Sequence, residues 1–444
     1  MDPRLGSATH TALAAPLHPP LAPGAALVEA DRCLGCGGLD AAAPCAAACP
    51  AEIDVPRFID QIAAGDDVGA AQTIFAANLL GGTCARVCPV EVLCEGACVL
   101  HHEGRKPIAI GLLQRHATDV AFAKREGPVR PVAPRRSERV AIVGAGPAGL
   151  VCAGELAARG FTVTVHDEHT EVGGLARYAI APYRIGSDPL DSERLQIEEL
   201  GVAFRLGHPI DGEHLEEIGE ADAIFLGIGM GADTAIHYPG DGLNGVWESL
   251  PFIEALKFGT PPNVGTHAVV IGGGNTAIDV AREAVRLGAR TVTLVYRRTR
   301  AEMPAFEHEI AEAEDEGVRF AYLTDPVRIL GEHHVEGVEC LSMSLGEPDA
   351  SGRRRPQPVT GSERTLIADS VIKAIGQQPH REAAAWFGGL AFDGSRLAID
   401  PTTLQTSNPK VFAGGDVVGG TSVVQAVRDG KHAATAIEEW LCRS

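Results

Sequence analysis

The sequence has few aromatic residues, no excess of positive charge and no long apolar run. Its 444 residues include only 5 Tyr, 3 Trp and 13 Phe. Lys and Arg number 38 against 58 Asp and Glu, and the formal net charge of −20 disfavours binding to a phosphate backbone. No apolar run approaches the ~18 residues that a membrane span requires. We therefore expect a protein that binds neither nucleic acid nor membrane.

Glycine and proline, in contrast, are abundant, with 52 and 29 residues. With 45% hydrophobic and 22% charged residues, this composition is typical of a folded α/β protein rich in glycine turns. A length prior of ~150 residues per domain suggests about three domains. The Ala- and Pro-rich stretch Thr11–Leu27 lacks the cationic start and unbroken apolar core of a signal peptide. We expect an N-terminal arm over residues 1–30, either surface-laid or disordered, and a cytoplasmic location.

Eight of the 11 cysteines lie close together in the first hundred residues. They form two groups of four, Cys33-x2-Cys36-x8-Cys45-x3-Cys49-Pro50 and Cys84-x3-Cys88-Pro89-x4-Cys94-x3-Cys98. In a reducing compartment such groups bind metal more often than they form disulfides. Short spacings that end in Cys-Pro favour [4Fe–4S] clusters, whereas structural zinc sites more often use paired C-x2-C knuckles. Helical periodicity around these cysteines predicts a small α-helical iron–sulfur domain over residues 31–130.

A first dinucleotide-binding pattern follows a Pro-rich linker. The apolar strand beginning at Val140 runs into Gly144-Ala-Gly146-Pro-Ala-Gly149 and then into a helix. Such glycines allow a tight turn and let a pyrophosphate approach the helix N-terminus. The next strand ends at Asp167, where an acid can accept a hydrogen bond from a ribose hydroxyl. The combination of strand, glycine turn, helix and acid predicts a Rossmann-like fold.

The same pattern occurs a second time at His267–Ala277, with Gly272-Gly-Gly274 as the glycine turn. The position that matches Asp167 holds Tyr296, followed by Arg297 and Arg298. An acid there would repel a 2′-phosphate, whereas arginines can bind one. The second fold is therefore predicted to take NADPH, with NADH as the alternative if the two arginines only form a solvated strand end.

A third segment near the C-terminus completes the pattern. Val411-Phe-Ala-Gly414-Gly415-Asp416 is a strand that ends in an acid and precedes a helix beginning near Thr421. An acid at a strand end can hold a ribityl hydroxyl, and a helix N-terminus favours negative charge on a reduced flavin. Two-dinucleotide flavin reductases typically have a first dinucleotide fold that is interrupted by an inserted second fold and completed by a C-terminal segment. The predicted fold class is an α/β two-dinucleotide-binding (Rossmann-like) flavoprotein with an N-terminal α-helical iron–sulfur domain.

From about Arg32 to its C-terminus the chain resembles a known family. That family contains the small subunit of NADPH glutamate synthase, the N-terminal half of dihydropyrimidine dehydrogenase and flavin–iron–sulfur transhydrogenase subunits. The motifs that carry the resemblance are Arg32-Cys33-Leu-Gly-Cys36, Cys84-Ala-Arg-Val-Cys88-Pro89, Val295-Tyr-Arg-Arg298 with Met303-Pro304, Ala374-Ile-Gly376 and Ala413-Gly-Gly-Asp416. The resemblance implies FAD, two [4Fe–4S] clusters and NADPH (or NADH) as cofactors.

One position separates the members of this family. In dihydropyrimidine dehydrogenases a Gln in an I-G-x-L-Q run completes the cluster nearer the flavin, whereas glutamate synthase and transhydrogenase relatives carry Glu. This chain reads Ile110-Gly-Leu-Leu-Gln114. The resemblance implies cluster 1 on Cys33, Cys36, Cys45 and Cys98, and cluster 2 on Cys49, Cys88, Cys94 and Gln114. The alternative is that Gln114 faces solvent and Cys84 is the fourth ligand of cluster 2.

The predicted nucleotide-binding residues follow the same motifs. For FAD they are Gly144, Gly146, Pro147, Ala148, Gly149, Asp167, Gly174, Leu175, Arg184, Gly415, Asp416 and Val424. For NADPH they are Gly272, Gly274, Asn275, Thr276, Ala277, Arg297, Arg298, Ala374 and Gly376. The FAD domain is predicted in two segments, over 131–255 and over 371–444, with the NAD(P)H domain over 256–370 between them.

The chain differs from the family pattern in two places. Its second and third cysteines are separated by eight residues instead of four, which predicts a bulged loop over Gly37–Pro44. After Gly174 it reads Leu-Ala-Arg-Tyr-Ala-Ile-Ala-Pro182-Tyr-Arg184 where relatives carry G-I-P-x-F-R, which alters the wall near the flavin.

The leading hypothesis is an NADPH-oxidising subunit that feeds electrons through FAD and the clusters to another polypeptide. The expected partner is an FMN-containing pyrimidine-reducing subunit of a bacterial dihydropyrimidine dehydrogenase. The first alternative is a glutamate synthase small subunit, which serves another electron-accepting large subunit. A third hypothesis, of a different class, is a non-catalytic scaffold with zinc in the cysteine domain. Because the cofactors carry the hydride chemistry, no catalytic side chain is predicted.

Overall fold

The computed structural model describes residues 16, 18–38, 42–125, 131–210, 214–349 and 352–443. The chain divides into two compact units. Of the described residues, the larger unit contains those within 18–177, 184–230 and 379–443, and the smaller contains residue 16 and those within 178–183 and 231–378.

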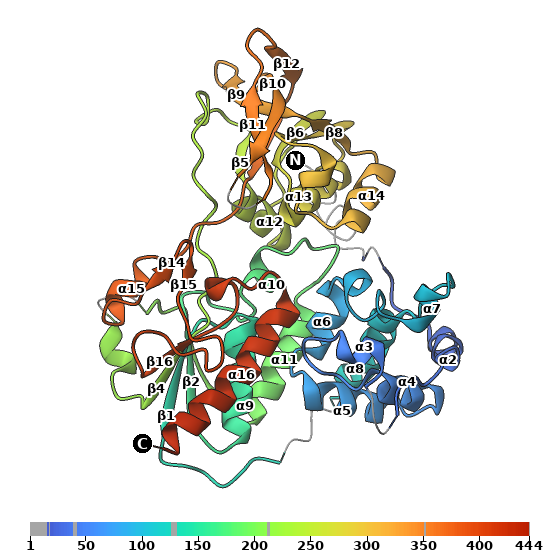
Figure 1. The fold of residues 1–444 in the computed structure, drawn as a ribbon, viewed down its shortest axis with the longest axis vertical. Coiled ribbons are helices and arrows are strands. Elements are labelled where there is room, and N and C mark those ends of the chain that lie inside the picture. Colours follow the sequence, from blue (N-terminus) through green and yellow to red (C-terminus); the bar gives the residue numbers. More distant parts are fainter. Residues whose placement is uncertain are drawn as a thin grey trace. The chain divides into compact units, whose positions relative to one another are not determined.

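The larger unit begins with a helical region that carries the eight clustered cysteines (Figure 1, blue). Asp54 and Asp66 start two of its helices by accepting hydrogen bonds from the backbone N–H groups of Arg57 and Gly69. The apolar side chains of these helices are buried in one core. The elements are α2 (Pro23–Asp31), α3 (Pro44–Ala47), α4 (Val55–Ala63), α5 (Asp67–Ala77), α6 (Gly81–Val87), η1 (Val90–Val92), α7 (Val99–His102) and α8 (Ile110–Lys124).

The same unit contains a five-stranded parallel sheet in the order β16-β4-β1-β2-β3. Its strands are β1 (Arg139–Val143), β2 (Thr162–Asp167), β3 (Ala203–Leu206), β4 (Ala223–Leu226) and β16 (Val411–Ala413). Helices α9 (Pro147–Ala158) and α16 (Val423–Leu441) lie side by side along this sheet (Figure 1). The remaining elements are α10 (Leu175–Tyr178), α11 (Asp188–Glu199), η2 (Leu215–Ile218), α15 (Ala383–Trp386), β14 (Phe392–Asp393), β15 (Arg396–Leu397) and η4 (Asp416–Val418).

The smaller unit contains a second five-stranded parallel sheet, in the order β5-β13-β6-β7-β8. Its strands are β5 (Val246–Glu248), β6 (His267–Gly272), β7 (Thr291–Tyr296), β8 (Arg319–Tyr322) and β13 (Ser370–Ala374). An antiparallel sheet of β9 (Thr324–Leu330), β10 (Gly337–Pro348), β11 (Arg354–Pro358) and β12 (Arg364–Ile367) is inserted before β13. The helices are α12 (Ser249–Lys257), α13 (Asn275–Arg286), η3 (Arg300–Glu302) and α14 (Glu307–Asp315). Two Rossmann-like sheets with an N-terminal helical domain confirm the predicted fold class.

Two predicted boundaries need correction. The predicted arm over residues 1–30 extends too far, because Pro23 occupies the first turn of α2 and Ala26 and Ala30 are buried in the core. The predicted NAD(P)H domain over 256–370 is too short at both ends. The smaller unit includes residues 231–378, because β5 pairs with β13 and so places the chain before residue 256 in this unit. Residues 1–15 of the arm lie outside the described residues.

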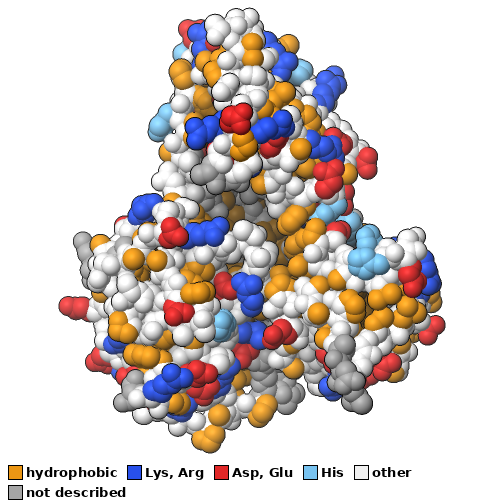
Figure 2. Space-filling view, in the orientation of Figure 1, with side chains coloured by type: hydrophobic (Ala, Val, Ile, Leu, Met, Phe, Trp, Pro, Cys, Tyr) orange, Lys and Arg blue, Asp and Glu red, His pale blue; other side chains and the backbone are white. Residues whose placement is uncertain are grey.

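Among the described residues, no helix is both long enough and apolar enough to cross a membrane. On the face shown in Figure 2, Lys and Arg side chains are scattered among Asp and Glu, and the coloured residues form no continuous basic surface.

Candidate functional site

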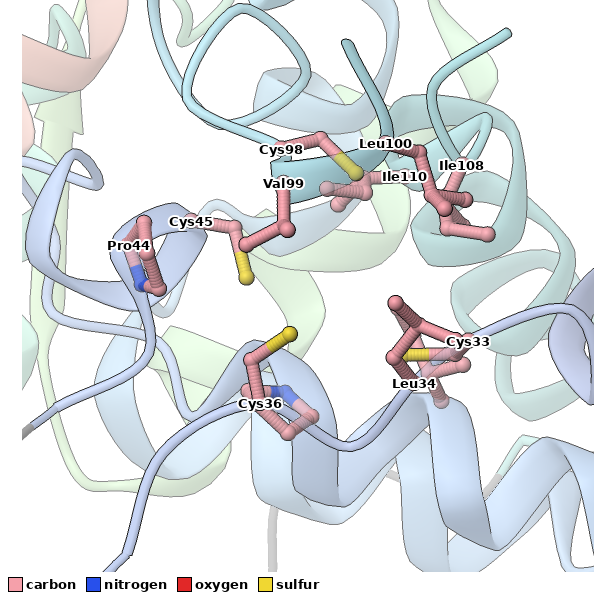
Figure 3. A pocket seen from close by; sticks show the side chains of 12 residues that line it. Cys33, Leu34, Cys36, Pro44, Cys45, Cys98, Val99, Leu100, Ile108 and Ile110 are labelled. Carbon is pink, nitrogen blue, oxygen red and sulfur yellow. The ribbon is translucent and has the colours of Figure 1, made fainter. Parts of the chain in front are cut away.

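Four cysteines of the helical region surround one pocket. Their sulfur atoms enter it from different sides, as Figure 3 shows for Cys33, Cys36, Cys45 and Cys98. Every other residue that lines the pocket is apolar: Leu34, Pro44, Pro56, Ile59, Val99, Leu100, Ile108 and Ile110. These four cysteines are the set expected for cluster 1, although Cys98 lies far from the others in the sequence.

The chemistry of this pocket fits an iron–sulfur cluster. Burial raises the pKa of the Cys45 thiol to about 11 and also raises the pKa of Cys33, with a smaller contribution from neighbouring thiols. A metal group that binds all four as thiolates removes this cost by displacing the protons. Among the described residues, no three His, Cys, Asp or Glu side chains meet closely enough to hold one ion. Four thiols spread around a pocket suit a polynuclear cluster.

The other four cysteines form a second, more buried group. Cys88 lies within hydrogen-bonding reach of Cys84, and this contact together with burial raises the pKa of the Cys88 thiol well above its usual value. Cys94 and Cys49 also interact electrostatically with Cys88. None of these four cysteines forms a disulfide. The structure therefore brings Cys49, Cys84, Cys88 and Cys94 together, which suits a second cluster.

Gln114 contacts the first residue of α6, the helix that carries Cys84, and does not face solvent. It is buried on α8, and its Nε2 donates a hydrogen bond to the Gly81 carbonyl oxygen over 2.7 Å. Gly81 begins α6, the helix that carries Cys84 and leads into Cys88. Because a carboxylate only accepts hydrogen bonds, a Glu at this position could not make this contact in its ionised form, whereas the amide of Gln114 can.

The first glycine turn has the shape that a bound pyrophosphate requires. A side chain at Gly144 would lie 2.4 Å from the Gly227 oxygen, and one at Gly149 would lie 1.9 Å from the Gly144 oxygen. A Cβ at Gly146 would meet no atom closer than 3.8 Å, so the space over the N-terminus of α9 stays open. Two glycines are thus needed for the turn, and one leaves room for a ligand.

Two acids lie at the strand ends of this sheet, as the sequence predicted. Asp167 ends β2 and accepts a hydrogen bond from the Ala145 N–H of the glycine turn at 2.6 Å. Asp416 follows β16, and burial raises its pKa to about 6, with a further contribution from Asp429. The remaining FAD candidates are all in the larger unit. Pro147 and Ala148 start α9, Gly174 precedes α10, and Leu175 starts it. Arg184 directly follows residues 178–183, which belong to the smaller unit, Gly415 precedes η4, and Val424 is buried in the first turn of α16.

Sequence reasoning missed Asp429, which shapes the turn that holds Asp416. Asp429 is buried on α16, and its Oδ2 accepts a hydrogen bond from the Gly415 N–H at 3.0 Å. Gly415 has a φ of 80°, a left-handed conformation that favours glycine. An acid followed by Gly430 inside a helical pattern was the available signal, because such a pair is unfavourable in a helix without a tertiary role.

The second glycine turn repeats this arrangement in the smaller unit. A side chain at Gly272 would lie 2.2 Å from the Ala374 oxygen, whereas one at Gly274 would meet nothing within 4 Å. Gly274 precedes the first turn of α13, so its open side faces the helix N-terminus. The other NADPH candidates are Asn275, Thr276 and the buried Ala277 at the start of α13, Ala374 at the end of β13, and Gly376 just after it.

The two predicted phosphate-binding arginines have different environments. Arg298 is buried, and its guanidinium forms an ion pair with Asp349 at 2.9 Å and donates to the Arg354 oxygen at 2.8 Å. Arg297 is exposed. The side chain of Arg298 is thus already engaged within the fold, whereas the exposed Arg297 remains the candidate of this pair for binding a 2′-phosphate.

The comparisons with known proteins agree with this geometry. Residues 14–126 match the family model described as dihydropyrimidine dehydrogenase domain II, 4Fe-4S cluster. Residues 138–438 match the pyridine nucleotide-disulphide oxidoreductase model. The described residues in these ranges are the ones that form the cysteine-bearing helices and the two Rossmann-like sheets.

Several curated proteins align with nearly the whole chain. The NADPH glutamate synthase small chain of Halomonas elongata is 38% identical and covers 96% of this chain and 93% of its own length. That of Escherichia coli is 36% identical with the same coverage. The NADP(+)-dependent formate dehydrogenase subunit beta of Moorella thermoacetica is 37% identical, and the match covers 95% of this chain and 64% of its own length. Among solved structures, Mycobacterium tuberculosis FprA in complex with NADPH has a TM-score of 0.57 at 22% identity, covering 69% of this chain and 85% of FprA, which supports the fold.

Proposed function

Since the chain belongs to the glutamate synthase small-chain family, we propose that it delivers electrons to a separate subunit that reduces pyrimidines with FMN. The general activity follows from the family: the chain is an NADPH-dependent oxidoreductase with FAD and [4Fe–4S] clusters. Family members serve as small subunits of larger complexes. The identity of the acceptor is what we propose.

The chain's own residues bind and orient the cofactors. When bound, FAD converts a hydride from NADPH into single electrons, and the clusters provide their route out. The open sides of Gly146 and Gly274 would receive the two pyrophosphates. Cys33, Cys36, Cys45 and Cys98 would hold cluster 1, and Cys49, Cys88 and Cys94 would hold cluster 2. The side chains therefore position the groups and set their potentials rather than transfer protons.

The presence of Gln at position 114 is the observation that favours a pyrimidine-reducing acceptor subunit. In the family, Gln at this position distinguishes dihydropyrimidine dehydrogenases from members with Glu. Its amide nitrogen is held by the Gly81 oxygen, so its carbonyl oxygen is available as the fourth ligand of cluster 2. This ligand would leave Cys84 as a buried neighbour of Cys88.

A glutamate-forming partner is the second candidate. It is favoured by the 38% and 36% identical relatives, which are glutamate synthase small chains aligned over 93% of their length. For either partner, we propose a cytoplasmic location, where a reducing environment keeps the unpaired thiols available for clusters.

Reconstitution tests the acceptor. The purified chain should reduce ferricyanide with NADPH but should not reduce uracil alone. Adding an FMN-containing pyrimidine reductase should give NADPH-dependent uracil reduction. Glutamate formation after addition of a glutamate synthase large subunit, without uracil reduction in the first mixture, would overturn the proposal in favour of the second candidate. The matched control is Cys36→Ser, in which NADPH should still reduce the flavin while either coupled activity is lost.

A further inference from the structure

The loop after Cys49 turns back on the backbone of that cysteine. The Glu52 N–H donates a hydrogen bond to the Cys49 carbonyl oxygen at 2.9 Å. Glu52 reaches this arrangement with a φ of 61°, an uncommon value for a residue other than glycine. The backbone and the charges around a ligand residue tune the potential of an iron–sulfur cluster. The course of this loop therefore matters for the cluster that Cys49 binds.

One charged side chain from the nucleotide-binding region holds this loop. The Nζ of Lys431, on α16, donates a hydrogen bond to the Ala51 oxygen at 2.8 Å. The Glu52 carboxylate lies 3.6 Å from the same Nζ, but it is 83% exposed, so solvent weakens its influence. Lys431 thus places a positive charge at the carbonyl oxygen of Ala51, two residues after Cys49.

The position of Lys431 is fixed by the packing of the helix that carries it. A Cβ at the preceding residue, Gly430, would lie 2.5 Å from the Ala148 oxygen of α9. Without that atom, α16 packs directly on the backbone of α9, the helix at the first glycine turn. Lys431 therefore links the helix pair of the FAD site to the Cys49 loop.

A second buried contact holds α6, the helix that carries Cys84 and leads into Cys88. Glu193, on α11, is fully buried, and its carboxylate accepts hydrogen bonds from both the N–H and the Oγ1 of Thr83. Thr83 lies in the first turn of α6, which carries Cys84 and leads into Cys88. In contrast, the pocket of cluster 1 is lined only by residues between Cys33 and Ile110, all from the helical region.

We propose that Lys431 is a positioning residue for cluster 2, which fixes the Cys49 loop against the FAD-binding helices and stabilises the reduced cluster with its positive charge. Reduction adds an electron to a cluster that thiolates already make negative, and a nearby cation favours that step. Lys431 thereby raises the potential of cluster 2 relative to cluster 1. The inference rests on the assignment of Cys49 to cluster 2 and does not depend on which acceptor takes the electrons.

Redox titration followed by EPR tests this role in the intact, cluster-loaded protein. Cys49→Ser first identifies the signal of cluster 2. Lys431→Met should then lower the midpoint potential of that signal alone, with unchanged FAD content and an unchanged midpoint for cluster 1. Lys431→Arg should retain the wild-type midpoint. Lys124→Met, which removes a positive charge from the end of α8, is the matched control and should leave both midpoints unchanged.

The outcomes separate the possible failures. If Cys49→Ser alters neither cluster, the ligand assignment is wrong. If it alters one cluster but Lys431→Met leaves both midpoints at wild-type values, the role of Lys431 is refuted. If Lys431→Met fails to assemble clusters, Lys431→Gln decides, because it can still donate to the Ala51 oxygen without a charge. A lowered cluster 2 midpoint in that variant supports the proposal, and a wild-type midpoint overturns it.

Discussion

Arg297 and Arg298 are adjacent, but the structure predicts that their replacement has different consequences. A charge-assisted hydrogen bond contributes ~1.5–3 kcal/mol, which is about a 10- to 150-fold change in binding. Because Arg297 is exposed and directly follows β7, where a 2′-phosphate is expected, Arg297→Ala should raise the KM for NADPH by about that factor. The KM for NADH and the melting temperature should stay unchanged, because NADH lacks the phosphate and Arg297 is not in the core.

Arg298→Ala should instead destabilise the NADPH unit. The substitution removes an ion pair with Asp349 and a hydrogen bond to the Arg354 oxygen. Asp349 is 24% exposed and stays partly solvated, so we expect a loss of about 1–3 kcal/mol. At ~2–4 °C per kcal/mol, the melting temperature should fall by several degrees, with similar effects on both nucleotides.

Steady-state kinetics with NADPH and NADH, combined with thermal unfolding, distinguish the two roles. Arg297→Lys is the matched control, because it keeps the charge and should retain most of the preference for NADPH. The reasoning is refuted if Arg298→Ala impairs NADPH alone at an unchanged melting temperature while Arg297→Ala has no effect.

Three further predictions concern the cluster ligands, the helix packing and a buried carboxyl. Gln114→Cys should change the EPR signal of one cluster, whereas Cys84→Ser should leave both clusters and the iron content intact; the reverse pattern would assign Cys84 as the ligand. Gly430→Ala should cost about 1–3 kcal/mol, because the new Cβ would lie 2.5 Å from the Ala148 oxygen; an unchanged denaturation midpoint would contradict the close packing. Burial raises the pKa of Glu283 to about 8, so the folded chain holds a proton that the unfolded chain releases above ~4.5. The free energy of unfolding should therefore fall as the pH rises from about 4.5 to about 8, and Glu283→Gln should make this decline shallower in urea titrations; an equal decline in both proteins would exclude Glu283 as a contributor.

The features that the sequence predicted well are local ones. A glycine turn between a strand and a helix is encoded within about ten residues, because each glycine meets a steric requirement of the same turn. This is why the turns at Gly144–Gly149 and Gly272–Gly274 could be identified, together with Asp167 at the end of the following strand. The grouping of Cys98 with Cys33 could be inferred only from the family resemblance, since helix packing brings these residues together.

The features that the sequence could not predict depend on distant contacts. Asp349 lies 51 residues after Arg298, and Thr83 lies 110 residues before Glu193. Lys431 and Ala51 are separated by 380 residues. Such pairs leave no periodic signal, so a buried arginine resembled a ligand-binding one. The segment Tyr178–Tyr183 departs from the family pattern in sequence, and the structure places it in the NADPH unit.

Metal analysis combined with EPR of the NADPH-reduced chain tests whether NADPH electrons reach clusters held by the N-terminal cysteines. We expect about eight iron atoms per chain, as two [4Fe–4S] clusters require, and the appearance of cluster signals when NADPH is added. A chain that contains zinc instead of iron, or clusters that NADPH leaves oxidised, would contradict this expectation.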